Sequence, residues 1–286
     1  MAQQAAETSA AAAVYRLPQS ASPKTPGRAE RLMKRAAAPV LVLVLFLAVY
    51  EGVVRLFQIP NYLLPGPSDI YKAAARNWDN LTAAVGTTVV ESLIGFVVSI
   101  FIGIGMAIAL ALSKPVERAV FPYAVVLQTI PIVAVAPIIV IWFGAGMKAI
   151  IVIVFLISFF PILINTLIGL NATDTNMKNL FYLYNATKMQ TIWKLRIPAA
   201  LPYIAAGVKI SSSLAVIGAI VGEFTAGIGG GKGGLGYAIT VAAARIQIPY
   251  LFTCVLAASL LGVALFLAVK AISKRMLQSW HESEMD

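Results

Sequence analysis

Long apolar runs, each close to the length that crosses a lipid bilayer, constrain this chain of 286 residues more than any other feature. We place predicted spans at residues 37–57, 83–112, 118–142, 148–170, 199–226 and 249–272. A helix needs ~20 apolar residues to cross the hydrocarbon core, and a segment in lipid must pair its own backbone groups. The sequence therefore predicts an all-α, polytopic membrane protein with about six transmembrane helices.

Composition supports this class and narrows the function. Only 12% of residues are charged and the mean hydropathy is +0.85, whereas soluble domains are about a quarter charged. One cysteine, Cys254, and one histidine, His281, exclude a disulfide framework, a clustered metal site and catalysis within the membrane. We expect no catalytic residue, no metal and no cofactor. The net charge of +10 reflects topology rather than nucleic-acid binding.

The basic residues are distributed unevenly between the predicted loops. With the N-terminus in the cytoplasm, 15 of the 22 Lys and Arg residues fall on the inner side and six on the outer side, with Lys209 inside a span. Cytoplasmic loops carry an excess of Lys and Arg. The chain is therefore expected to start and end in the cytoplasm, an N-in/C-in topology.

Three regions follow along the chain. Residues 1–30, rich in Ala, Ser, Gln and Pro, are predicted to be a disordered cytoplasmic tail. Residues 31–275 form the predicted transmembrane domain, and residues 276–286 a short cytoplasmic tail. The first apolar run begins near Ala37, too far along for a cleaved signal peptide.

The polar segment 171–198, between two apolar runs, is the longest predicted cytoplasmic loop. We predict two short helices in it, at 176–184 and 188–196, joined at Asn185, a residue that tolerates the left-handed conformation. Thr187 and Gln190 have the spacing of a capping box. Pro198 is expected to push Ile197 out of the helix and to begin the next one.

Several aromatic residues lie in this loop. They are Phe181, Tyr182, Tyr184 and Trp193. These are more than a solvated connection needs, so the pair of helices is interpreted as a docking surface for a soluble partner.

The same residues resemble the "EAA" signature of bacterial ABC importer permeases, in which a Glu-Ala-Ala helix is followed by Gly and later by Pro. Asn185 falls on the Gly position, and Pro198 stands thirteen residues after it, as in the signature. Asn179-Leu180-Phe181 falls on Glu-Ala-Ala, so the acidic residue is absent here. The resemblance implies that the coupling loop contacts the ATPase through Asn179, Tyr182, Tyr184, Asn185, Ala186, Thr187 and Pro198.

Further motifs, spread over residues 60–275, are similar to the nitrate/sulfonate/taurine branch of these permeases, which includes importers of thiamine-precursor pyrimidines and of riboflavin. The motifs are Asn61–Pro67, Gln128–Pro131, Ala136-Pro137, Trp142–Gly144, Phe159–Pro161, Gly222-Glu223 and Gly234–Tyr237.

The resemblance implies an ATP-driven importer in the bacterial inner membrane. Two permeases, expected to be identical, would form the pathway, and two cytoplasmic ATPases would dock on the loop helices. A periplasmic or lipid-anchored binding protein would deliver a small solute: a nitrate-, sulfonate- or taurine-like anion, a pyrimidine or riboflavin. A secondary transporter without an ATPase is the alternative, although it usually shows internal repeats that this sequence lacks.

Polar residues within the predicted spans are candidates for the solute pathway. Glu223, Gln128 and the neighbouring Pro131 are the candidates, and a purely structural role for Glu223 and Gln128 is the alternative. Glu91 and Lys209 are given structural or interfacial roles.

Glycines form two patterns in the sequence, one in the second predicted span and one in the loop after the fifth. Gly95, Gly103 and Gly105 in the second span are expected to let another helix approach closely. Gly229-x-Gly231-x-x-Gly234 matches a dinucleotide-binding pattern, but an apolar helix precedes it instead of a strand, so we predict a flexible outer loop and no nucleotide site.

Overall fold

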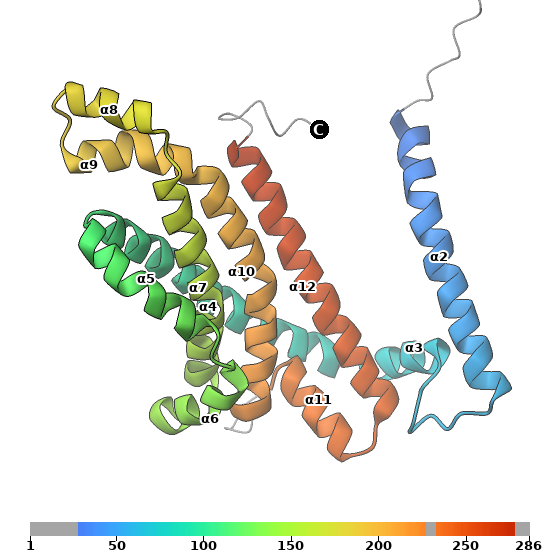
Figure 1. Ribbon diagram of the computed structural model, residues 1–286. Helices are drawn as coiled ribbons and strands as arrows, with labels where there is room; N and C mark the ends of the chain where they lie inside the picture. Colours follow the sequence, from blue (N-terminus) through green and yellow to red (C-terminus); the bar gives the residue numbers. More distant parts are fainter. Residues whose placement is uncertain (1–27, 227–232, 278–286) are drawn as a thin grey trace, which may run out of the picture. The chain divides into compact units, whose positions relative to one another are not determined.

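The computed structural model describes residues 28–226 and 233–277, and within these ranges all regular structure is helical (Figure 1). The all-α fold is therefore confirmed. The tail at 1–27, residues 227–232 of the glycine-rich loop and residues 278–286, including His281, lie outside the described residues. Contacts between residues divide the chain into two units, 1–52 and 53–286.

The first unit is described from Arg28 and consists of most of helix α2 (Arg28–Leu56). Its stretch Ala37–Leu56 is 20 residues long and apolar enough to cross a membrane. This confirms the span predicted at 37–57.

Four long helices dominate the second unit. They are α4 (Trp78–Ala111), α7 (Met147–Asn171), α10 (Ile197–Ala226) and α12 (Ile248–Leu277), and all four are long and apolar enough to cross a membrane. Two shorter helices, α3 (Pro67–Arg76) and α11 (Leu235–Ala244), precede α4 and α12. The second, fourth, fifth and sixth predicted spans are confirmed.

The third predicted span differs from the expectation of one interrupted helix. The chain forms α5 (Lys114–Gln128) and α6 (Ile132–Phe143), which meet at an angle of 98°. Pro131 alone marks the break, because a proline disfavours helical geometry at the residue before it, whereas Pro122 and Pro137 lie inside the two helices. The described residues thus hold five membrane-capable helices, or six if the bent pair counts as one.

Helix α7 is the centre of the second unit, because both α4 and α10 pack along it. The buried cluster includes Phe96 of α4, Ile153 and Ile162 of α7, and Ala215 and Ala219 of α10. Serine side chains add hydrogen bonds between the helices. Ser99 Oγ donates to the carbonyl of Phe155 at 3.1 Å, and Ser211 Oγ to that of Ser158 at 2.8 Å.

Glycines allow this close packing, as predicted for α4. A Cβ added at Gly95 would lie 2.5 Å from Val154 Cβ, and one at Gly103 would lie 3.0 Å from Ile162 Cγ2, so both glycines face α7. Gly105 was also expected to allow close approach of another helix, but a Cβ added there meets no described atom within 4 Å.

Gly95→Ala should destabilise the second unit by about 1–3 kcal/mol, because the added methyl group overlaps Val154 and the carbonyl of Ile151. Gly105→Ala is the matched control on the same helix, and alanine there should leave stability unchanged or slightly higher. The measurement is the melting midpoint of the purified protein in detergent. Equal midpoints for the two variants would contradict the packing of α4 on α7.

Candidate functional site

The segment between α7 and α10 begins with helix α8 (Thr175–Leu183). Asp174 caps it, because its Oδ1 accepts hydrogen bonds from the backbone nitrogens of Asn176 at 2.6 Å and Met177 at 3.1 Å. Such a cap satisfies amide groups that a helix start leaves free. The helix is therefore fixed at the point where it leaves the end of α7.

Asn185 makes the corner after α8, as predicted. Its φ is 53°, the left-handed conformation. The backbone nitrogen of Asn185 donates to the carbonyl of Tyr182 at 2.9 Å, and that of Ala186 to the carbonyl of Phe181 at 3.0 Å. These two bonds form a Schellman motif, which ends a helix at a residue that tolerates positive φ.

The next helix, α9 (Lys188–Thr191), starts with the predicted capping box. Gln190 N donates to Thr187 Oγ1 at 3.2 Å, and Thr187 N donates to Gln190 Oε1 at 2.8 Å. Corner and cap together hold α8 and α9 in one hairpin.

The expectation that α9 ends before Pro198 is wrong. Helix α9 continues through the π-helical turn η1 (Ile192–Arg196) directly into α10, and Ile197 is helical, with φ −64° and ψ −49°. Ile197 N bonds to the carbonyl of Ile192, five residues back. In an α-helix the Pro198 ring would clash with the carbonyl four residues earlier, and the π turn moves the carbonyls out of that register.

The predicted coupling residues lie mostly on the surface of this hairpin. Asn179, Tyr182, Tyr184, Asn185 and Thr187 are exposed, and Ala186 and Pro198 are half-buried. Tyr182 and Tyr184 are 81% and 80% exposed. Their contact with an ATPase stays a prediction.

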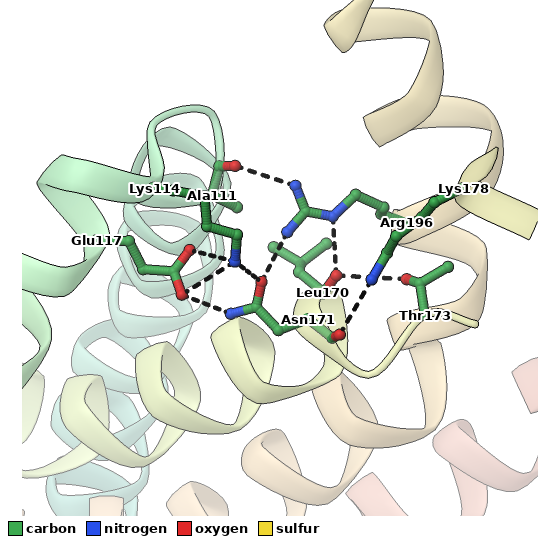
Figure 2. A network of polar contacts seen from close by, with 8 residues as sticks. All are labelled: Ala111, Lys114, Glu117, Leu170, Asn171, Thr173, Lys178 and Arg196. Atoms are coloured by element: carbon green, nitrogen blue, oxygen red, sulfur yellow. Dashed lines mark hydrogen bonds and ion pairs between the residues drawn. The ribbon is translucent and has the colours of Figure 1, made fainter. Parts of the chain in front are cut away.

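Arg196 anchors the hairpin to the helix bundle (Figure 2). It is buried, and its Nε donates to the carbonyl of Leu170 at 2.8 Å, its Nη1 to the carbonyl of Ala111 at 3.0 Å and its Nη2 to Asn171 Oδ1 at 2.9 Å. The last carbonyls of a helix have no partner within it and carry its negative dipole end. One guanidinium therefore joins the ends of α4 and α7 to the start of α10.

Asn171 extends this network to α5. Its Nδ2 donates to Glu117 Oε1 at 2.7 Å, and Lys114 Nζ bonds to Glu117 Oε2 at 3.0 Å and also to Asn171 Oδ1 (Figure 2). Lys178 Nζ of α8 donates to the carbonyl of Asn171 at 3.3 Å. The sequence did not identify Arg196, Asn171 or Glu117 as partners of one another. The one feature that they share in the sequence is a position at the border of an apolar run.

Glu223, a candidate for the pathway, lies in a second buried cluster. It is 1% exposed, and its carboxylate accepts hydrogen bonds from Thr88 Oγ1 at 2.7 Å and from the backbone nitrogen of Gly236. A Cβ at Gly234 or Gly236 would overlap Glu223, so glycine is needed for this approach. These contacts match the structural alternative, and the pathway role stays a prediction.

Glu91 is also buried, beside Glu223. The sequence placed both carboxyl groups within spans but gave no indication that they meet. Glu91 therefore belongs to the same buried cluster between α4 and α10 as Glu223.

Gln128 and Pro131 lie at the bend between α5 and α6. Gln128 is exposed and lines a cavity of about 250 Å³ whose other walls are apolar side chains such as Leu156 and Phe160. Pro131 is the N-cap residue directly before α6. The pathway role predicted for both is compatible with this position and stays a prediction.

The family of binding-protein-dependent transport system inner membrane components matches residues 99–278, which include the hairpin and both buried clusters in large part. The chain belongs to this family. It is 36% identical over 257 residues to the formylaminopyrimidine transport permease protein ThiX of Halalkalibacterium halodurans, covering 88% of this chain and 100% of ThiX. It is 31% identical to the riboflavin transport system permease protein RibX of Chloroflexus aurantiacus, covering 88% and 95%.

A solved structure supports the fold. The inward-facing MetNI methionine ABC transporter has a chain that superimposes with a TM-score of 0.53 at 21% identity, covering 71% of this chain and 95% of that one. The protein is a multi-pass permease subunit of an ATP-driven importer in the bacterial inner membrane, and ATP hydrolysis belongs to a separate subunit. Its partners are this ATPase and a solute-binding protein. Nothing in these comparisons favours the secondary transporter considered as the alternative.

Proposed function

We propose that the hairpin 171–198 is the element through which the ATPase moves the spans, and that the permease carries an uncharged heterocyclic solute. The observation that carries the coupling proposal is the continuous helix from Lys188 to Ala226, 39 residues long. A push on α9 is transmitted along this helix without a flexible joint, since η1 keeps it hydrogen-bonded.

Surface chemistry supports docking at the hairpin. Tyr182, Leu183 and Tyr184 surround the Asn185 corner, and Trp193 is also exposed, at 60%. Exposed aromatic residues are typical anchors of protein interfaces, because they bury large areas and lose little side-chain entropy. The ATPase is expected to receive these side chains in a groove.

Two further features are proposed from the family. We infer that two copies of this chain form the pathway and bind two ATPases, because the importers it resembles use two permeases. The proposed orientation is N-in/C-in, supported by the 15-to-6 distribution of basic residues.

The proposed solute class is supported by the sequence identity of this chain to permeases of known solute. Identity is 36% and 31% to the pyrimidine and riboflavin permeases, but 26% and 23% to the sulfonate and taurine permeases SsuC of Bacillus subtilis and TauC of Escherichia coli. A cavity of about 490 Å³ between α4, α10 and α12 has an apolar lining that includes Phe96, Ile104 and Val208. An apolar lining offers an anion no polar partners in place of the water that it loses, whereas an uncharged heterocyclic ring can pack against it.

Orientation can be tested with single cysteines at two exposed positions, Lys148 at the start of α7 and Lys188 in the hairpin. A membrane-impermeant maleimide should label Lys148→Cys in intact spheroplasts and Lys188→Cys only after permeabilisation. Native Cys254 is fully buried and serves as the unlabelled background. Labelling of both variants in intact spheroplasts would refute the topology.

Solute class can be tested in proteoliposomes that contain the permease, its ATPase and its binding protein. Labelled formylaminopyrimidine or riboflavin should accumulate about tenfold or more above taurine and nitrate, a discrimination that needs ~1.4 kcal/mol. ATP-dependent accumulation of taurine or nitrate above both heterocycles would reject the proposal.

The Asn185 corner provides the test of coupling. Asn185→Gly should keep solute uptake, because glycine adopts positive φ freely. Asn185→Val should cost about 1–3 kcal/mol at this backbone geometry, misplace α8 against α9 and lower uptake about tenfold or more. Uptake and solute-stimulated ATP hydrolysis are measured in reconstituted complexes, with melting midpoints as the control for folding. Normal stimulation in Asn185→Val would show that the hairpin is not the coupling element.

A further inference from the structure

A cavity of about 610 Å³ lies between the hairpin and the connection from α4 to α5. Four cationic residues contribute to its lining: Lys114, Lys178, Lys188 and Arg196. Among the described residues that line it, none is acidic. Of the nearby carboxylates, Glu117 binds the cavity residue Lys114 and also Asn171, and Asp174 caps α8.

Two of the other cations, Arg196 and Lys114, repel the ammonium group of Lys178. Burial lowers the pKa of Lys178, and the positive charges of Arg196 and Lys114 lower it further, against an opposing effect of Asp174. A lysine in this position gains from any anion that enters. Among the described residues, Lys114 is the only one of the four cations with a carboxylate at ion-pair distance, so the cavity carries an excess of positive charge, which favours an anion.

The residues that line the cavity indicate its depth in the membrane. Ala111 is the last residue of the 34-residue helix α4, Lys114 is the first of α5, and Arg196 directly precedes α10. Helices that cross the bilayer end in the headgroup layer. In the proposed orientation this layer is the cytoplasmic leaflet, where basic pockets between membrane helices hold anionic headgroups.

We propose that this cavity binds the phosphate of an anionic phospholipid headgroup, with Lys178 and Lys188 as the main contacts. Helix α5 begins at the cavity and exposes Val116, Val120 and Tyr123 at i, i+4 and i+7 spacing, an apolar stripe on which acyl chains can lie. The cavity is also large for a single carboxylate from the ATPase, whereas its volume is in the range of small-molecule sites. The assignment to the cytoplasmic leaflet rests on the proposed function, but the site itself does not.

The test uses the full chain in complex with its ATPase, purified in detergent and titrated with the soluble lipid dihexanoylphosphatidylglycerol. Lys178→Gln/Lys188→Gln should weaken binding about twenty-five-fold, since each basic residue near a membrane surface contributes about fivefold to anion affinity. Lys194→Gln is the matched control, because Lys194 belongs to the same segment but lines a different cavity, and it should bind as the wild type does. If the double variant melts early, Lys188→Gln alone, at an exposed position, should show a fivefold loss.

Two further arms identify the ligand. Inorganic phosphate should bind at least tenfold more weakly than the lipid, and dihexanoylphosphatidylcholine, whose headgroup carries a choline cation, should also bind weakly. Equal affinity for inorganic phosphate would overturn the lipid as the source, and equal loss of lipid binding in Lys194→Gln would overturn the cavity as the site. Retained lipid binding together with loss of the ATPase from the double variant would assign the cavity to an ATPase carboxylate instead. Because the titration needs no ATP hydrolysis, its result is independent of the Asn185 test of coupling.

Discussion

The hydrogen bonds of Arg196 to the carbonyls of Leu170 and Ala111 hold the ends of α7 and α4 against the start of α10. A planar guanidinium suits this position, because its fixed fork of donors reaches several acceptors at once. Replacement of the fork by a single ammonium would leave helix-end carbonyls without partners in a buried place, which is costly. The position of the hairpin against the helix bundle therefore depends on one buried side chain.

Local structure was predictable wherever a short stretch of sequence determines it. The apolar runs predicted the long helices, and the Thr187/Gln190 spacing and the left-handed Asn185 predicted the cap and the corner of the hairpin. These features rest on interactions between residues at most a few positions apart, so composition and spacing reveal them.

The long-range features were not predictable from one sequence. Arg196 meets Ala111 across 85 positions, and Thr88 meets Glu223 across 135, and nothing in either residue's surroundings specifies the partner. Pro131 and Pro198 look alike as helix breakers, yet one bends the chain by 98° and the other is absorbed by a π turn. The proline by itself therefore does not decide whether the helix bends.

The two buried clusters lie at opposite ends of the same pair of helices. Thr88 near the start of α4 binds Glu223 near the end of α10, while Ala111 at the end of α4 accepts from Arg196 just before α10. These hydrogen bonds hold the antiparallel helices α4 and α10 together at both ends. Separation at either end would leave buried polar groups without hydrogen-bond partners, which is costly. Between the clusters the contacts of α4 and α10 with α7 are glycine and aliphatic packing, which carries no fixed hydrogen-bond register except at the serines. In the proposed coupling, a displacement of α9 thus acts on α4, α7 and α10 together, because Arg196 bonds the ends of both α4 and α7.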